Sequence, residues 1–169
     1  MNVRLERSED REASLAVERV AFEGPLEADI AEAVRDEQGA FALVADIGGV
    51  VVGHVQLSRA WIGGSNVVAL GPIGVLPDRQ GRGVGTALVG EALDEAARRG
   101  EPAVILLGAP DYYGRFGFVP GSLYGLRNPF AGETEQGFTI AEEDFQIALL
   151  DETRASELSG EVRWHAAFG

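Results

Sequence analysis

The stretch Gln80-Gly81-Arg82-Gly83-Val84-Gly85-Thr86 decides the fold, because it joins two segments with different apolar patterns. Residues 67–75 before it are apolar throughout and predict a buried strand. The apolar residues after it recur at helical spacing and predict a helix that ends near Gly100. Glycines in such a turn let the backbone bend sharply and present successive N–H groups to a phosphate at the N-terminus of the helix. The stretch therefore predicts an anion-binding turn between a strand and a helix.

Two common phosphate-binding loops do not fit this stretch. A Walker loop needs Lys followed by Ser or Thr after its last glycine, and Gly85 is followed by Thr86 and Ala87. A dinucleotide fingerprint that starts at Gly83 needs glycine where the chain has Leu88. A purely structural glycine-rich turn remains an alternative.

The N-terminal third predicts two helices followed by a hairpin. Ser8 is a suitable N-cap, and the spacing of Ala13, Val17 and Val20 predicts an amphipathic helix over residues 9–22. A second helix is predicted to begin at Pro25 and to end before residue 39. Residues 40–57 alternate around a Gly-Gly turn and predict a β-hairpin.

The remaining segments complete a mixed α/β pattern. Residues 103–107 form a short apolar run after a helix, which is typical of a parallel strand that completes a β-α-β crossover. Residues 145–149 alternate like a strand, whereas residues 123–137 show no clear period. Pro72 cannot donate to a sheet ladder, so strand pairing should be interrupted near it. We therefore expect one sheet flanked by helices.

Composition narrows the classes of function. The chain has 169 residues, 46% hydrophobic and 24% charged, which predicts a single globular domain. Its formal net charge of −13 disfavours a nucleic-acid partner and favours cationic molecules over anionic ones. It has no cysteine, so a disulfide framework, a thiolate zinc site and a Cys nucleophile are excluded.

The sequence also predicts a cytoplasmic protein. Residues 1–7 carry charges where a signal peptide needs an apolar stretch. No apolar run approaches the roughly 20 residues that cross a bilayer. We therefore expect neither export nor a membrane partner, and a reducing compartment agrees with the missing cysteines.

Two motifs resemble the GNAT superfamily of N-acetyltransferases. Gln80, Gly83 and Gly85 match the family pattern Gln/Arg-x-x-Gly-x-Gly/Ala, and residues 111–118, Asp-Tyr-Tyr-Gly-Arg-Phe-Gly-Phe, resemble its Tyr-x-x-x-Gly-Phe stretch. The resemblance implies the GNAT acyl-CoA N-acyltransferase fold, with a mixed central sheet that is splayed at the cofactor site. It implies one domain over residues 1–169, of which residues 123–169 form a C-terminal extension that the motifs do not cover.

The resemblance further implies that acetyl-CoA is the acetyl donor. Amides from Gly81 to Thr86 are expected to hold its pyrophosphate, and the backbone near Gly74 is expected to pair with its pantetheine arm. The implied cofactor-binding residues are Ile73, Gly74, Val75, Gln80, Gly81, Arg82, Gly83, Val84, Gly85 and Thr86.

In GNAT enzymes an amine attacks the thioester through a tetrahedral intermediate, and the thiolate of CoA leaves. By motif position Tyr113 is the general acid that protonates the thiolate, with Tyr112 as the second choice. His54 is the candidate general base, with Asp78 and Asp111 as weaker candidates. Each aromatic or imidazole side chain has an ordinary alternative role, since tyrosine often packs and a strand histidine often lies in the core.

The resulting hypothesis is an N-acetyltransferase that acts on a primary amine of a small molecule or a protein. The form of residues 112–118 and the tail over residues 160–168 resemble a bacterial subgroup of predicted N-acetyltransferases with an unassigned acceptor. A catalytically silent CoA-binding sensor or interaction module is the alternative. Transfer of a longer acyl group or transfer onto a hydroxyl stays open, as does a homodimer.

Overall fold

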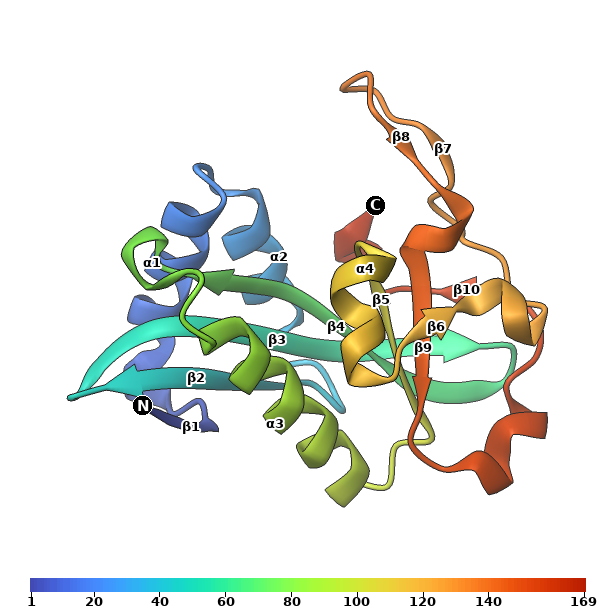
Figure 1. The fold of residues 1–169 in the computed structure, drawn as a ribbon, viewed down its shortest axis with the longest axis horizontal. Coiled ribbons are helices and arrows are strands. Elements are labelled where there is room, and N and C mark those ends of the chain that lie inside the picture. Colours follow the sequence, from blue (N-terminus) through green and yellow to red (C-terminus); the bar gives the residue numbers. More distant parts are fainter. The chain divides into compact units, whose positions relative to one another are not determined.

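The computed structural model describes residues 1–169, and the chain forms two compact units (Figure 1). The first unit comprises residues 1–59, 70–95 and 165–169, and the second comprises residues 60–69 and 96–164. Strands β3 (Val50–Ile62) and β4 (Ser65–Val75) and helix α3 (Val84–Arg98) each contribute to both units. The organisation of residues 1–169 as one domain stays a prediction.

The first unit is built on antiparallel strands, as the alternating sequence predicted. β1 (Asn2–Leu5) pairs with β2 (Phe41–Ile47), and β2 pairs with β3. Gly48 and Gly49 have φ angles of 61° and 85°, which suit the mirror-image turns that fit the twist of a hairpin. The Asp46 carboxylate accepts a 2.8 Å hydrogen bond from the Gly49 amide. The predicted hairpin is confirmed, and β3 is longer than predicted.

The two predicted N-terminal helices are present with different ends. A 3-10 turn (Ser8–Asp10) precedes α1 (Arg11–Ala21), and α2 covers Leu26–Val34. The predicted apolar stripe of α1 was partly wrong, because Val20 is 49% exposed whereas Ser14, Val17 and Glu18 are buried. The buried face of α1 therefore includes a carboxylate.

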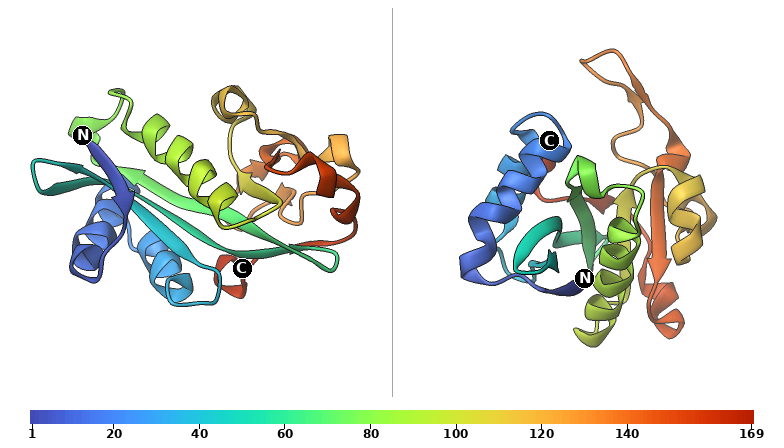
Figure 2. Two further views of the ribbon diagram at one scale, coloured as in Figure 1. Left: turned by 90° about the horizontal axis from the view of Figure 1, so that it is seen from below. Right: turned by 60° about the vertical axis from the view of Figure 1, so that its left-hand side comes forward.

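Helices cover both faces of the strands in the first unit. In the left view of Figure 2, α1 and α2 lie below these strands and α3 lies above them. Gly53 in β3 allows α3 to approach closely, because a Cβ at this position would lie 2.8 Å from Val84 Cγ1 and 2.9 Å from Leu88 Cδ1. The start of α3, directly after the glycine-rich turn, is thus packed against a strand position that has no side chain.

The second unit contains the parallel crossover that the sequence predicted. β4 pairs with β5 (Ala103–Leu107) in parallel, with Val68 opposite Val104 and Ala69 opposite Ile105. β5 pairs with β9 (Phe145–Leu149), β9 with β6 (Val119–Pro120), and β10 (Val162–Arg163) with the end of β3. The strand predicted over 145–149 is confirmed. The β4–β5 register ends at Ala69, before Pro72.

A cluster of buried apolar residues lies in the core of the second unit. Phe145 is fully buried within it, and the Trp164 ring lies 5.6 Å from the Phe145 ring in an edge arrangement. The buried members are Ala60, Ile62, Val67, Ala69, Ala103, Ile105, Leu126, Phe145, Ile147, Leu158 and Val162.

The segment without a clear sequence period contains short elements. The helix α4 (Pro110–Tyr113) is followed by 3-10 turns at Gly114–Phe116 and Gly121–Tyr124, and β7 (Gly132–Glu133) pairs with β8 (Thr139–Ile140). Strands of two residues are too short to show alternation. Further 3-10 turns cover Pro77–Arg79, Glu142–Asp144, Glu152–Glu157 and Ala166–Phe168. None of the helices has the length and apolar character that crossing a bilayer requires.

Candidate cofactor and catalytic site

The glycine-rich turn has the backbone shape that its sequence predicted. Gly81 and Gly83 have φ angles of 70° and 84°, and no heavy atom lies within 4 Å of the position that a Cβ would occupy at either residue. The Gln80 side chain donates a 3.0 Å hydrogen bond to the Val75 carbonyl, which ties the turn to the end of β4. The turn is therefore shaped by backbone conformation and leaves open space beside it.

The turn also leaves backbone donors without a partner in α3. The Gly83 carbonyl accepts the first helical hydrogen bond, from Ala87, at 3.0 Å. The four N–H groups that precede Ala87, from Gly83 to Thr86, consequently have no acceptor within the helix. These groups and the helix dipole favour an anion at this end of α3.

The β4 residues before the turn lie against α1 on one side. Gly74 is buried, and a Cβ on it would lie 2.8 Å from Glu18 Oε2 and 3.2 Å from Ala21 Cβ. The neighbouring Ile73 and Val75 are half-buried and, by the alternation of a strand, face the other way. Gly74 thus gives α1 a close approach to the backbone of β4.

His54 lies in the interior of the first unit. Its imidazole is fully buried, with Nδ1 2.6 Å from Glu18 Oε1 and Nε2 3.8 Å from Glu6 Oε1. Burial raises the pKa of the Glu18 carboxyl, and the hydrogen bond with His54 opposes that rise. Glu18 was not predicted as a site residue. The one sign of Glu18 in the sequence is that it follows the buried residue Val17 in α1. The apolar pattern did not show which face of this helix is buried.

Tyr113 ends α4 in the second unit and is half-buried among aromatic rings. Its ring lies 4.8 Å from that of Tyr112 and 5.9 Å from that of Phe118, both edge-on, and it occupies the space where Gly108 has no Cβ. Burial, with a smaller contribution from Tyr112, raises the pKa of Tyr113 to about 12. The phenol therefore keeps its proton at neutral pH.

The second-choice residues have other surroundings. The Arg115 guanidinium lies 4.3 Å from the centre of the Tyr112 ring, and its Nε donates a 2.9 Å hydrogen bond to the Tyr112 carbonyl. Asp78 is exposed in the 3-10 turn after β4, 3.8 Å from Arg79, and Asp111 is exposed in the first turn of α4.

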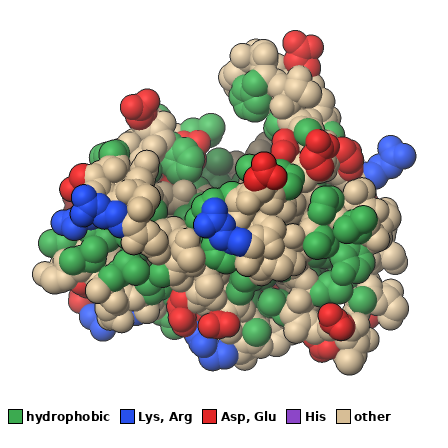
Figure 3. Space-filling view, in the orientation of Figure 1, with side chains coloured by type: hydrophobic (Ala, Val, Ile, Leu, Met, Phe, Trp, Pro, Cys, Tyr) green, Lys and Arg blue, Asp and Glu red, His purple; other side chains and the backbone are tan.

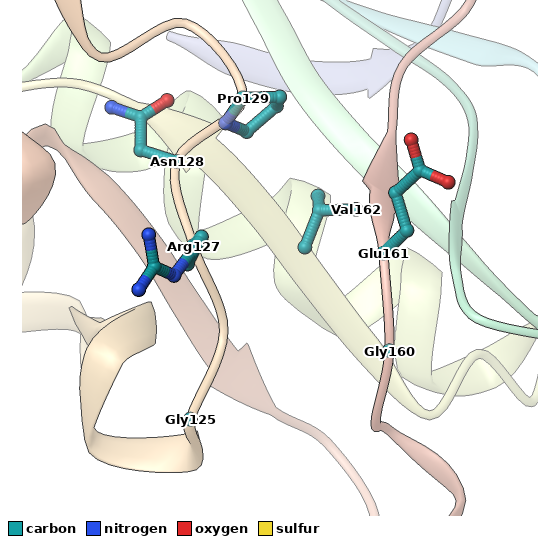
Figure 4. Close-up of a pocket in the computed structure, with 7 residues that line it drawn as sticks. All are labelled: Gly125, Arg127, Asn128, Pro129, Gly160, Glu161 and Val162. Atoms are coloured by element: carbon teal, nitrogen blue, oxygen red, sulfur yellow. The ribbon is translucent and has the colours of Figure 1, made fainter.

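A pocket of about 440 Å³ lies within the second unit, and none of the predicted site residues lines it. Figure 4 shows it between two backbone segments, with Arg127 on one and Glu161 on the other. Both polar atoms of the Asn128 side chain already form hydrogen bonds within the protein, since Nδ2 donates to the Ala141 carbonyl and Oδ1 accepts from the Phe130 amide. The lining residues are Gly125, Arg127, Asn128, Pro129, Gly160, Glu161 and Val162.

Comparison with known families gives the identity. The family described as Acetyltransferase (GNAT) family matches residues 6–118, which include the glycine-rich turn, His54 and Tyr113. The chain belongs to the GNAT acetyltransferase family. This confirms the family resemblance and the mixed α/β GNAT fold that the two motifs implied.

Relatives of this GNAT protein align along almost its full length. It is 31% identical over 172 residues to the protein described as uncharacterized N-acetyltransferase YhbS of Escherichia coli (strain K12), covering 99% of this chain and 98% of that protein. The crystal structure of E. coli YhbS in complex with CoA has a TM-score of 0.87 at 30% identity, covering 99% of this chain and 91% of that one. A GNAT acetyltransferase from Brucella melitensis in complex with acetyl-CoA has a TM-score of 0.76 at 31% identity, covering 99% and 97%.

The structure groups the predicted site residues of this GNAT protein within its two units. The first unit contains the glycine-rich turn, the β4 residues 73–75 and His54. Within it, Glu18 contacts both Gly74 and His54. Tyr113 belongs to the second unit. The roles of these residues stay predictions.

Proposed function

We propose that the protein transfers the acetyl group of acetyl-CoA to a primary amine. The observation that carries this proposal is the turn at residues 80–86, which combines glycines at positive φ with four amides that have no acceptor within α3. Relatives at 30% and 31% identity were solved with CoA and with acetyl-CoA, which supports the same ligand here. We propose that residues 1–169 act as one domain.

The residues of the turn fit a pyrophosphate. Open space beside Gly81 and Gly83 leaves room for phosphate oxygens close to the backbone, and a Cβ at either position would fill that room. In this proposal the amides from Gly81 to Thr86 hold the pyrophosphate, and Gln80 and Arg82 flank it. The backbone of Ile73, Gly74 and Val75 holds the pantetheine arm. When bound, acetyl-CoA supplies the thioester that the amine attacks.

The proposed reaction is a direct transfer. An ammonium acceptor first loses a proton, its nitrogen then bonds to the acetyl carbon, and the C–S bond breaks with its electron pair on sulfur. A backbone N–H of β4 stabilises the oxyanion that forms in between. The Tyr113 phenol protonates the departing thiolate and regains a proton from the new amide nitrogen, so the net products are the amide, the CoA thiol and one proton.

His54 is the proposed side chain that draws the first proton from the acceptor. Because the imidazole is fully buried, this role needs an intermediate group between His54 and the acceptor.

A cationic acceptor is part of the proposal. The chain has a net charge of −13, which favours the approach of cationic molecules. In Figure 3 acidic side chains gather at the foot of the β7–β8 hairpin, where Glu142, Glu143 and Asp144 form one 3-10 turn. The acceptor is an amine of a small molecule or of a protein, and nucleic acid is not a proposed partner. A homodimer is compatible with this function.

Release of the CoA thiol from acetyl-CoA in the presence of amines tests the proposal. The probes are spermidine, tyramine and a short peptide with a free α-amine and one lysine. We expect amine-dependent thiol release with at least one probe, and mass spectrometry should show the acetylated amine. If the protein binds acetyl-CoA but none of the three amines causes release of the CoA thiol, this proposal is wrong and the protein is a catalytically silent CoA-binding module.

A further inference from the structure

Gln146 is a buried polar side chain that the proposed reaction leaves without a role. It lies in β9, opposite Leu106 of β5 and Pro120 of β6, and it is 0% exposed. Its Nε2 donates a 2.7 Å hydrogen bond to the Gly108 carbonyl, and its Oε1 has no hydrogen-bond partner. Burial of an amide costs free energy unless the amide is hydrogen-bonded. The bond to Gly108 is therefore the interaction that favours glutamine over an apolar residue at this position.

Hydrogen bonds hold Gly108 on β9 at both of its backbone groups. Its N–H donates a 2.9 Å hydrogen bond to the carbonyl of Asp144, the residue before β9, and its carbonyl accepts the bond from Gln146. The next residue, Ala109, precedes α4, and its carbonyl accepts a 3.1 Å hydrogen bond from the Tyr113 amide. Gln146 is thus connected to the backbone of Tyr113 through only two residues.

The Tyr113 ring packs directly on Gly108. A Cβ at residue 108 would overlap Cε2 of this ring and would lie 2.8 Å from its Cδ2. Gly108 has no positive φ, so the absence of a side chain provides space for the ring rather than an unusual backbone conformation. Because Cε2 is bonded to the ring carbon that carries the hydroxyl, the position of Gly108 limits where the phenol oxygen can lie.

The other contacts of Tyr113 also depend on packing. Its ring lies 5.9 Å from the buried ring of Phe118, shortly before β6, which pairs with β9 at Gln146. Burial and Tyr112 raise the pKa of Tyr113, without a contribution from a hydrogen bond to its hydroxyl. Helix α4 has four residues, fewer than a helix needs to be stable on its own. The phenol is therefore fixed by the segments that pack around it.

We propose that Gln146 is a positioning residue that fixes the Tyr113 hydroxyl, through Gly108, at the place where the CoA thiolate leaves. This inference rests on the proposed function, in which Tyr113 protonates the thiolate. No bond forms or breaks at Gln146. Proton transfer needs its donor and acceptor within hydrogen-bond reach, and a displacement of about 1 Å can slow a reaction about 100-fold. Loss of the bond to Gly108 should therefore slow the reaction although the acid is still present.

A double-mutant cycle on kcat tests this inference, at saturating acetyl-CoA and with an amine probe that supports thiol release. Gln146→Leu removes the amide donor at similar volume, Tyr113→Phe removes the hydroxyl, and the double variant completes the cycle. Gln56→Leu is the matched control in the first unit. Gln56 is also 0% exposed, its Nε2 donates to the Phe41 and Leu57 carbonyls, and its Oε1 has no partner.

We expect Gln146→Leu to lower kcat about 10-fold in the intact protein and less than about 2-fold in the Tyr113→Phe background. The Kd for acetyl-CoA should not change. Gln56→Leu should change kcat by the same factor in both backgrounds. Thermal unfolding verifies that each variant is folded. If Gln146→Leu does not fold, Gln146→Met carries the same cycle, because methionine is unbranched and flexible and has no donor.

Three results would count against the inference. An equal factor for Gln146→Leu in both backgrounds, or no effect on kcat in the intact protein, overturns this inference alone. A wild-type kcat for Tyr113→Phe excludes the phenol as the acid and overturns this inference, while acetylation of the amine stands. No thiol release by the intact protein overturns the proposed function and this inference with it.

Discussion

Substitution of Gly53 by alanine tests how packing positions the glycine-rich turn. A Cβ at residue 53 would lie 2.8 Å from Val84 Cγ1 and 2.9 Å from Leu88 Cδ1, and both side chains are buried. Relief of this overlap requires α3 to move away from β3. Overpacking of a core by this amount costs about 2 kcal/mol of unfolding free energy, which lowers Tm by about 4–8 °C in a chain of this size.

The same displacement should weaken acetyl-CoA binding. Val84 and the glycine-rich turn are continuous in the chain, so a shift of the first turn of α3 moves the amides that are proposed to hold the pyrophosphate. Loss of one such hydrogen bond corresponds to about 1.4 kcal/mol, or a tenfold higher Kd. Urea unfolding measures the first effect, and calorimetric titration with acetyl-CoA measures the second.

Gly90→Ala is the matched control in the same helix. No heavy atom lies within 4 Å of a Cβ at residue 90, and its φ is not positive. This variant should gain about 0.5–1 kcal/mol of stability from helix propensity and should leave the Kd unchanged. The reasoning is refuted if Gly53→Ala unfolds at the wild-type midpoint, or if it is destabilised yet binds acetyl-CoA with wild-type affinity.

Two further predictions concern the proposed acid and an ion pair. Tyr113→Phe should reduce amine-dependent thiol release by about 100-fold with unchanged acetyl-CoA affinity, and equal turnover would exclude the phenol as the acid. The Asp10 carboxylate accepts hydrogen bonds from the Arg4 side chain at 2.6 and 3.0 Å and from the Arg7 amide at 2.8 Å. These hydrogen bonds lower the pKa of Asp10, and those from Arg4 have the largest effect. Its stabilising contribution is therefore complete above the ordinary Asp pKa and is lost as pH falls through the lower folded-state value. Asp10→Asn should lower Tm by about 4–8 °C at neutral pH, for about 2 kcal/mol, but not in strong acid, whereas the exposed Glu9→Gln should change Tm little. An equal Tm difference at all pH values would contradict this account of Asp10.

Local sequence patterns predicted most of the fold. The change from alternating to helical spacing located the hairpin and α3, and the short apolar run after that helix located β5, four of whose five residues are buried. The β7–β8 hairpin was not predictable, because its strands have two residues each. The buried face of α1 was misplaced by one position, since Glu18 is buried against His54, which lies 36 residues away in the chain. Apolar periodicity cannot show a buried carboxylate whose partner is so distant.

The part of the candidate site that backbone groups form, the glycine-rich turn, was predictable from the sequence. Glycine spacing marked the turn and the likeness to acetyltransferases, because glycine adopts positive φ angles such as those at residues 81 and 83 at the least cost. Side-chain networks depend on which faces meet after folding. The contacts that join Glu6, Arg35 and Glu18 to His54 come from four separate elements or loops, and no sequence spacing connects them.

Calorimetric titration with acetyl-CoA tests the central claim most directly, with the intact protein, Gly83→Glu and Gln136→Glu compared. Glutamate at residue 83 places a side chain and a negative charge in the space proposed for the pyrophosphate, whereas Gln136→Glu adds the same charge at an exposed turn. We predict saturable binding by the intact protein and by Gln136→Glu, and none by Gly83→Glu. Failure of the intact protein to bind acetyl-CoA, or equal binding by Gly83→Glu, would contradict the account.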